Sequence, residues 1–472
     1  MLFNSVDFLL FLPCVFLLYW FVFKKIKSQN LFILFASYLF YGWWDWRFLF
    51  LILASTLVDY SIGLLLDKSI ENKKRKYLLY TSLVFNLGLL GIFKYYDFFI
   101  DNWIYAWSEI GITMHKGSLN IILPVGISFY TFQTLSYTID VYKKKIDPTK
   151  NFIAFASFVS FFPQLVAGPI ERASNLLPQF FKKREFSYPL ASSGMKLILW
   201  GFFKKIVIAD NCAVFANDIF NNYQDQSGAT LALGAVYFAF QIYGDFSGYS
   251  DIAIGVARLF GFKLMRNFNY PYFSRDIAEF WRRWHISLST WFRDYLYIPL
   301  GGSRGSKYKK VRNVLIIFIV SGFWHGANWT FITWGALNAV YFLPLLLTNR
   351  NRNNTDHVSK NSHLPSIKTI FQILVTFCLT TFAWIFFRAE NMTIALDYIN
   401  RMFSIQDGKN IGFNIFNAII IIFLALEWIS RKSESIQIKN KYLRYLFYII
   451  IIQTILFYSA SNKPQDFIYF QF

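Results

Sequence analysis

The sequence predicts an all-α protein that crosses a membrane many times, as one integral unit over residues 1–472. Hydrophobic residues make up 55% of the chain and charged residues only 16%, whereas soluble proteins carry about a quarter charged residues. Apolar runs suited to membrane helices recur along the chain, with lysine and arginine clusters between them. Aromatic residues reach 21%, which excludes a disordered chain. We therefore expect about ten to twelve membrane helices and re-entrant segments.

The first half of the chain shows a regular alternation of apolar runs and basic loops. Lysine clusters follow every second run, at 24–27, 68–76 and 143–145. Because basic loops stay in the cytoplasm, this order places the N-terminus outside. The mixed aromatic segment 97–120 suits the outer interface. The runs that predict these membrane helices are 8–23, 31–44, 48–66, 77–93 and 121–141.

The segment 152–170 is apolar but interrupted by Pro163, Gly168 and Pro169, and both flanks look cytoplasmic. Broken backbone at membrane depth is tolerated only where protein or a wet cavity surrounds it. We therefore predict a re-entrant segment here, and with it an internal site. Further apolar runs lie at 195–208 and 229–242.

The C-terminal part is regular again. Its basic loops, 350–368 and 431–441, both read as cytoplasmic, which places the C-terminus outside like the N-terminus. We expect the catalytic core at about residues 120–345 and peripheral helices at 1–119 and 346–472. The apolar runs here are 331–347, 370–387, 415–428 and 442–458.

The net charge of +20 is explained by the cytoplasmic loops, and we expect membrane lipid rather than nucleic acid as the surrounding partner. The three cysteines, Cys14, Cys212 and Cys378, all lie in apolar stretches. Their positions give neither a disulfide framework nor metal-ligand spacing. No metal site is expected. Motifs of serine hydrolases, zinc proteases and nicotinamide enzymes are absent from the sequence.

His325 lies within an apolar stretch, and an ionisable residue at that depth suggests function. On one continuous helix Ser321, His325 and Asn328 would share a face. Gly322 and Gly326 would let another helix approach closely. A neutral imidazole titrating near pH 6.5 suits general-base work on a hydroxyl. The alternative is a structural histidine that bridges two helices.

His285 lies in a segment that reads as one amphipathic helix over residues 279–297. At 100° per residue, Arg282, His285, Ser289 and Arg293 form a basic polar stripe opposite an aromatic face. The plain interpretation is a helix lying in the cytoplasmic interface. The functional interpretation is that the stripe faces a phosphate-bearing donor, because arginine suits phosphate.

Asp245 and Asp251 stand close together beside apolar sequence, with Arg258 as the nearest basic residue. We predict that they form a buried structural charge pair rather than catalytic groups.

Several polar motifs within apolar sequence resemble the membrane-bound O-acyltransferase (MBOAT) superfamily, in particular its bacterial alginate O-acetylation branch. The likeness covers most of the chain in order. The matching stretches are Leu123-Pro-Val-Gly-Ile-Ser-Phe-Tyr-Thr-Phe-Gln133, Phe161-Phe-Pro-Gln-Leu-Val-Ala-Gly-Pro-Ile170, Asp245-Phe-Ser-Gly-Tyr-Ser-Asp251, Phe280-Trp-Arg-Arg-Trp-His-Ile-Ser-Leu-Ser289, Arg293-Asp-Tyr-Leu-Tyr-Ile-Pro-Leu-Gly-Gly-Ser-Arg304 and Ser321-Gly-Phe-Trp-His-Gly-Ala-Asn-Trp329.

The resemblance implies that His325, in the Trp-His-Gly motif, is the essential catalytic residue and that His285 is the second characteristic histidine. Trp324, Ser321 and Asn328 would support His325, the last two as candidates to orient its ring. His285 would position the thioester or donate to the oxyanion. The implied fold is a ring of helices around a thin core, with a tunnel joining the two membrane faces.

The resemblance also implies an acetyltransferase of the bacterial cytoplasmic membrane. Acetyl-CoA, or another acyl thioester, would be the co-substrate, and no bound cofactor is expected. The acceptor would be an extracytoplasmic polysaccharide, alginate or another, reached through a periplasmic or membrane-anchored, esterase-like partner protein. Alternatives are the membrane subunit for peptidoglycan O-acetylation, D-alanyl transfer to teichoic acid, and, from a different class, a polysaccharide or lipid transporter.

Overall fold

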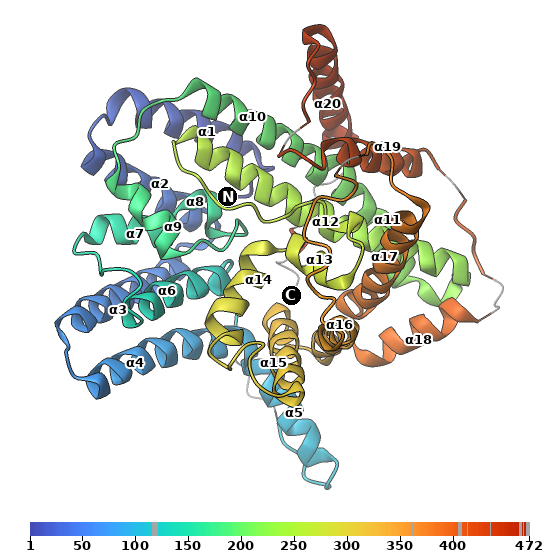
Figure 1. Cartoon of the computed structure of the whole chain (residues 1–472), viewed down its shortest axis with the longest axis horizontal. Helices are drawn as coiled ribbons and strands as arrows, with labels where there is room; N and C mark the ends of the chain where they lie inside the picture. The colour runs from blue at the N-terminus through green and yellow to red at the C-terminus, as the bar shows by residue number, and fades with distance from the viewer. Residues whose placement is uncertain are drawn as a thin grey trace. The chain divides into compact units, whose positions relative to one another are not determined.

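The computed structural model describes residues 1–115, 121–360, 362–404, 408–412, 414–434, 436–461, 465 and 467–468. The regular secondary structure of these residues is helical, and they form no β-strand, only one isolated bridge between Gln226 and Lys409 (Figure 1). The prediction of an all-α protein is confirmed. The chain divides into two compact units, residues 1–194 with 253–265 and residues 195–252 with 266–472.

Five helical stretches within the described residues are long and apolar enough to cross a membrane: 26–68, 72–108, 329–347, 367–388 and 441–461. Three shorter apolar stretches, at 6–22, 152–165 and 415–430, accompany them. A multi-pass membrane protein is the architecture that such a set of helices requires, since only helices and closed barrels span a bilayer.

The first unit begins with α1 (Val6–Leu17), which a π-helical turn extends to Val22, and with the hairpin of α2 (Ile26–Asp45) and α3 (Leu49–Lys68). The hairpin turn forms because Asp45 caps it and pairs with Arg47 at 2.6 Å. The remaining helices that lie wholly in this unit are α4 (Asn72–Leu90), α5 (Tyr96–Ser108), α6 (Ile127–Tyr142), α7 (Phe152–Ser160), α8 (Phe162–Leu165) and α9 (Ala173–Leu176).

Helices α3, α4 and α6 pack against one another (Figure 1). They surround the side chain of Asp59, which is fully buried. Thr138 donates to it at 2.9 Å and the amide of Asn86 at 2.8 Å, and Ser82 donates a third hydrogen bond. Polar groups inside a membrane bundle face its interior and pair there. This network therefore fixes how the three helices pack.

The start of α6 differs from the prediction of a helix over 121–141. Residues 121–126 are not helical, and α6 begins at Ile127. Gly126 adopts φ +77°, and a Cβ there would lie 2.7 Å from the carbonyl oxygen of Leu165. The close approach of two backbone segments, which only glycine permits, delays the helix.

The segment predicted to be re-entrant is broken into two short helices, α7 and α8. They have nine and four residues, too short for a hydrocarbon core about 30 Å thick at 1.5 Å per residue. Residues 154–171 are all buried. A broken segment enclosed by protein is what the prolines and glycine predicted; its depth in the membrane stays a prediction.

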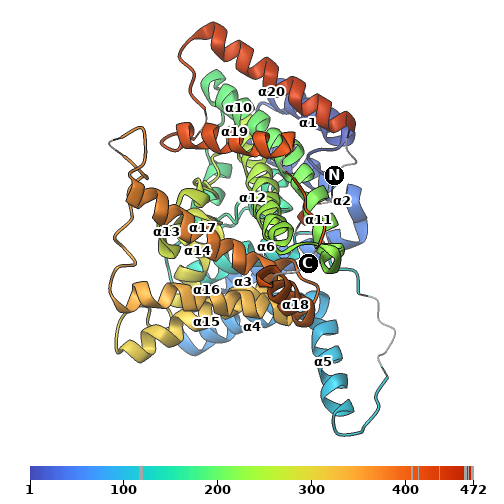
Figure 2. The same ribbon diagram turned by 90° about the vertical axis from the view of Figure 1, so that its right-hand side faces the viewer.

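The second unit carries both histidine motifs. Within it α15 (Lys307–His325) and α16 (Trp329–Leu347) run side by side as a hairpin (Figure 2). Two helices, α10 (Tyr188–Phe202) and α12 (Gly228–Leu259), contribute residues to both units. The other helices of this unit are α11 (Asp210–Asn221), α13 (Ile277–Arg283), α14 (Ile286–Phe292), α17 (Ile367–Arg388), α18 (Met392–Phe403), α19 (Ile415–Ser430) and α20 (Lys441–Ser461).

Candidate active site

His325 is the last residue of α15 and is 3% exposed. It is held there by glycines that bring α15 against α16. A Cβ on Gly322 would collide with the carbonyl oxygen of Phe331, and one on Gly335 with that of Phe318. The close helix approach predicted at Gly322 is therefore confirmed, with Gly335 as its partner in the contact. Gly326 lies beyond the end of α15, and a Cβ there would collide with the Phe331 ring.

Aromatic rings enclose His325 on several sides. Its ring centroid lies 4.8 Å from that of Trp324, 5.1 Å from Trp334 and 5.4 Å from Phe387. Phe387 comes from α17, a helix that the sequence placed outside the catalytic core. Such walls keep water away from an imidazole and strengthen its electrostatic interactions with a substrate.

The prediction of one helix that continues through His325 to Asn328 is wrong. Helix α15 ends at His325, Gly326 follows in extended conformation, and Asn328 caps α16 by accepting from the N–H of Thr330 at 3.0 Å. The Asn328 amide donates to the carbonyl of Glu390 at 2.7 Å. Both ends of this amide are therefore engaged, and Asn328 holds α16 rather than the His325 ring. Ser321 keeps its expected place one turn before His325.

His285 is 1% exposed and lies between α13 and α14 with φ +43°. A positive φ is rare for residues other than glycine and marks a constrained position. The Nδ1 atom lies 3.1 Å from the side-chain oxygen of Asn267, which also accepts from the N–H and hydroxyl of Ser287. The Asn267 amide donates to Ser250 at 3.0 Å, which fixes its orientation.

This hydrogen-bond pattern assigns the tautomer of His285. Because the Asn267 oxygen can only accept, Nδ1 carries the proton and Nε2 presents a lone pair. Nε2 is buried without a hydrogen-bond partner among the described residues. Burial lowers the pKa of His285 to about 3, so the ring is neutral near pH 7. A neutral ring in this tautomer accepts hydrogen bonds through Nε2, and the oxyanion-donor role expected for His285 does not fit it.

The two histidines come together although forty residues separate them in the chain. Their ring centroids lie 6.5 Å apart, and Trp324 lies 6.2 Å from His285 and 4.8 Å from His325. Phe246 of α12 stands edge-on to His285 at 4.6 Å. Two buried imidazoles at this separation can contact one small substrate group from two sides.

The prediction of one continuous amphipathic helix over residues 279–297 is wrong. The chain breaks at His285 into α13 and α14, and a π-helical turn follows at 293–297. His285 therefore leaves the stripe and turns into the core. Trp284 and Leu288 of the aromatic face are 1% and 2% exposed, so this face packs inside the protein and the interfacial-helix interpretation is also wrong.

The remaining stripe residues, Arg282, Ser289 and Arg293, line one pocket of about 470 Å³ together with Ser321. Its walls come from α13, α14, α15, α16 and the loop after α16. Apolar side chains such as Trp281 and Phe318 form most of its lining, and none of the described residues that line it is acidic. A concave apolar pocket with a few polar groups is typical of small-molecule sites. Because Ser321 is one turn from His325, the pocket extends to within one helical turn of the histidine pair.

Both arginines that were predicted to bind the donor already have partners. Arg282 donates to the carbonyl oxygens of Asn351 and Asn354 at 2.7 and 2.8 Å. Arg293 pairs with its neighbour Asp294 at 2.6 Å, and its side chain is 59% exposed. Arg282 therefore holds a loop, and Arg293 is locally neutralised.

The charge pair predicted around Asp245, Asp251 and Arg258 exists with other partners. Lys204 pairs with Asp251 at 2.6 Å, and Lys205 pairs with Asp245 at 2.8 Å. Arg258 instead donates to Ser193 at 3.4 Å. The correction has a geometric reason: the close glycines of α10 and α12 bring the lysines beside the aspartates. The sequence signal was two adjacent lysines inside the apolar run 195–208.

Lys205 also pairs with Asp210 at 2.8 Å and donates to the carbonyl of Gln465 at 3.0 Å. Asp245 accepts from the N–H of Ile468 at 2.6 Å. The described part of the C-terminal tail thus docks on this buried charge cluster, and Ile468 is 1% exposed. Sequence patterns did not indicate this contact.

Comparisons with known proteins identify the family and several relatives of this chain. A family model described as MBOAT, membrane-bound O-acyltransferase family, matches residues 143–388. A protein of Azotobacter vinelandii named "Probable alginate O-acetylase AlgI" is 41% identical over 86% of this chain and 79% of its own. A peptidoglycan O-acetyltransferase of Helicobacter pylori is 37% identical over 85% and 80%. A teichoic acid D-alanyltransferase of Streptococcus thermophilus is 31% identical over only 48% and 57%.

Proposed function

Because the chain belongs to the membrane-bound O-acyltransferase family, we propose that it moves an acetyl group from a cytoplasmic thioester, acetyl-CoA, to an extracytoplasmic polysaccharide hydroxyl. The observation that carries the proposal is the pair of buried histidines, 6.5 Å apart, beside a pocket lined by arginines. Its setting would be the bacterial cytoplasmic membrane.

His325 acts as the general base in this proposal. It takes the proton of the acceptor hydroxyl while the hydroxyl oxygen attacks the thioester carbonyl. The tetrahedral intermediate then expels the thiolate, which recovers the proton from the imidazolium of His325. His285 is a poor base because burial lowers its pKa to about 3. Its Nε2 lone pair accepts a hydrogen bond from an N–H or O–H group of a substrate and so positions it.

The donor enters through the pocket beside α13 and α15. The loop at 350–368, which contributes Asn351 and Arg352 to the pocket, is predicted to be cytoplasmic by its basic residues. A donor from the cytoplasm would therefore meet the pocket first and place its thioester near Ser321 and His325. A tunnel through the membrane, which the resemblance implies, is part of this proposal.

The acceptor is proposed to be alginate or another exopolysaccharide, reached with the help of a periplasmic or membrane-anchored, esterase-like partner. The similarity to alginate O-acetylases supports this choice. Peptidoglycan is the second candidate, because the Helicobacter pylori relative is nearly as similar over the same share of the chain. D-Alanyl transfer is less favoured, since the teichoic acid enzymes match about half of this chain.

A membrane-vesicle assay tests the proposal. Vesicles with the protein and its partner receive labelled acetyl-CoA on the cytoplasmic face, and labelled ester is measured in exopolysaccharide and in peptidoglycan. Wild type should label one polymer, and His325→Ala should label neither while still inserting in the membrane. His357→Ala, in an exposed loop, is the matched control and should retain activity.

The same assay separates the alternatives. Label in peptidoglycan alone would replace the exopolysaccharide proposal. Label that needs a carrier-protein thioester would favour D-alanyl-type donors. A transporter would pass an unmodified substrate across the membrane and keep doing so in His325→Ala. Ester formation by His325→Ala at the wild-type rate would refute the catalytic assignment.

A further inference from the structure

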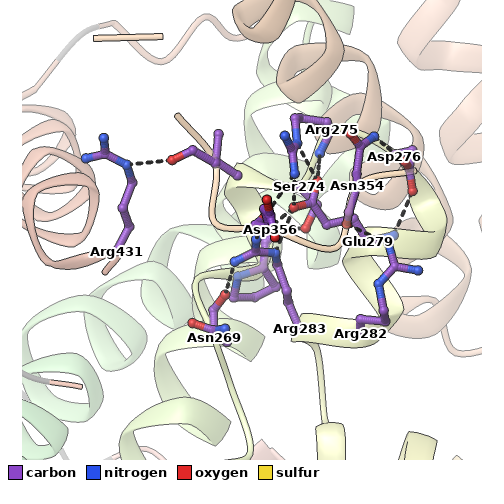
Figure 3. A network of polar contacts seen from close by, with 12 residues as sticks. Asn269, Ser274, Arg275, Asp276, Glu279, Arg282, Arg283, Asn354, Asp356 and Arg431 are labelled. Carbon is purple, nitrogen blue, oxygen red and sulfur yellow. Dashed lines mark hydrogen bonds and ion pairs between the residues drawn. The ribbon is translucent and has the colours of Figure 1, made fainter. Parts of the chain in front are cut away.

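The loop between α16 and α17 is held in place by arginine side chains that donate hydrogen bonds to its backbone carbonyls. We name residues 349–360 the clamped loop. Arg282 donates to the carbonyls of Asn351 and Asn354. Arg275 and Arg283 both donate to the carbonyl of Asp356 (Figure 3). Farther along, Arg431 donates to the carbonyl of Val358 at 3.0 Å. Hydrogen bonds from charged donors are the stronger kind, so this loop is fixed despite its lack of regular structure.

Two of the arginines that hold the clamped loop are themselves positioned by a buried carboxylate of α13. Glu279 is 1% exposed and pairs with Arg275 at 2.9 Å and with Arg283 at 2.7 Å. Asp276 caps α13 and accepts from the side chain of Asn354 at 2.5 Å (Figure 3). Helix α13 therefore sets the position of the clamped loop, and α13 ends two residues before His285.

The clamped loop supplies the one pocket cation among the described residues whose donors are unused. Three arginines line the pocket: Arg282, Arg293 and Arg352. Arg282 donates its hydrogen bonds to two backbone carbonyls, and Arg293 forms an ion pair with Asp294. Arg352 makes no hydrogen bond or ion pair with the described residues and acts electrostatically on Tyr297, which also lines the pocket.

We propose that Arg352 is the phosphate-binding residue of the donor pocket and that the Arg282 clamp positions it there. The proposal rests on the proposed function, since its ligand is the nucleotide end of the acyl thioester. A planar guanidinium binds phosphate through two parallel hydrogen bonds. The apolar pocket walls take the pantetheine arm, with Arg352 at the loop end of the pocket and Ser321 toward His325.

Direct binding tests this without requiring turnover. The full-length protein in detergent is titrated with desulfo-CoA, which carries the phosphates, and with pantetheine, which carries none. Arg352→Ala should weaken desulfo-CoA binding about tenfold, the low end for a charged hydrogen bond, because Arg352 is exposed in the free protein. Its affinity for pantetheine should not change. Arg352→Lys should recover part of the loss, since it restores charge but not the fork.

Arg350→Ala is the matched control. Arg350 is exposed in the same loop and lies outside the pocket lining. Its substitution by alanine removes the same charge as Arg352→Ala. It should leave both affinities unchanged. Equal losses in Arg350→Ala and Arg352→Ala, or an equal loss for pantetheine, would overturn the assignment, as would a wild-type protein that does not bind desulfo-CoA. Failure of the proposed acetyl transfer would appear differently, as intact desulfo-CoA binding without ester formation.

The positioning part has its own readout. Arg282→Ala should raise amide hydrogen exchange at residues 351–356 and weaken desulfo-CoA binding, while Arg352→Ala should leave exchange unchanged. If Arg282→Ala weakens desulfo-CoA binding with no change in exchange, Arg282 contacts the donor directly and the clamp is wrong. If neither exchange nor binding changes, Arg282 has no role in holding Arg352.

Discussion

A methyl group added at Gly322 should disable the enzyme without touching a catalytic atom. The Cβ of Gly322→Ala would collide with the carbonyl oxygen of Phe331 and lie 3.3 Å from the Cα of Gly335. Because the Phe331 carbonyl is part of the backbone and cannot rotate aside, α15 must move away from α16. A shift of roughly 1 Å at the helix that ends in His325 is expected to slow transfer about a hundredfold.

The assay compares acetyl-transfer rate and thermal stability in purified variants. Gly322→Ala should also lower the free energy of unfolding by about 1–3 kcal/mol, the usual cost of overpacking. Gly88→Ala is the control, because a Cβ at Gly88 in α4 meets nothing within 4 Å. A Gly322→Ala enzyme that keeps the wild-type rate would refute the claim that the α15–α16 contact sets the position of His325.

The remaining predictions concern the titration of His285, the buried partners of Lys205 and the membrane topology. Burial holds the pKa of His285 at about 3, below roughly 6.5 in an unfolded chain, so unfolding takes up a proton below pH 6.5. Wild type should lose about 2 kcal/mol of stability between pH 7 and pH 5 from this group, and thermal melts of His285→Gln should lack that loss. Lys205→Met leaves Asp210 and Asp245 buried without their shared cation and should cost about 3–5 kcal/mol; an unchanged melting temperature would contradict the pairing. Reporters fused after Phe472 should be active outside the cytoplasm and those at Lys73 inside it, and the reverse pattern would overturn the predicted topology.

The histidine pair could be located from the sequence, but its geometry could not. An ionisable residue inside apolar sequence draws attention wherever the chain folds, so His325 was visible at once. Helical periodicity then misplaced His285, because a period of 3.6 assumes an unbroken helix. The positive φ at His285 breaks that helix, and nothing in the residue type signals it.

Charge partners show a similar limit. From the sequence, Asp245 and Asp251 were predicted to pair with the nearest basic residue, Arg258. The partners are Lys204 and Lys205, some forty residues earlier. Glycine contacts between α10 and α12 decide this, and such contacts depend on which helices meet in space.

The sequence by itself determined that this protein is a helical membrane protein with two histidine motifs of an acyltransferase, because hydropathy and rare polar residues are local properties. Only the tertiary structure decided that His285 turns its Nε2 into the core, that Asn328 caps a helix, and that Arg282 grips a loop instead of the donor. These outcomes depend on backbone carbonyls and side chains contributed by distant segments. A guanidinium can donate hydrogen bonds to whichever acceptors lie close to it. The tertiary structure determines which acceptors those are.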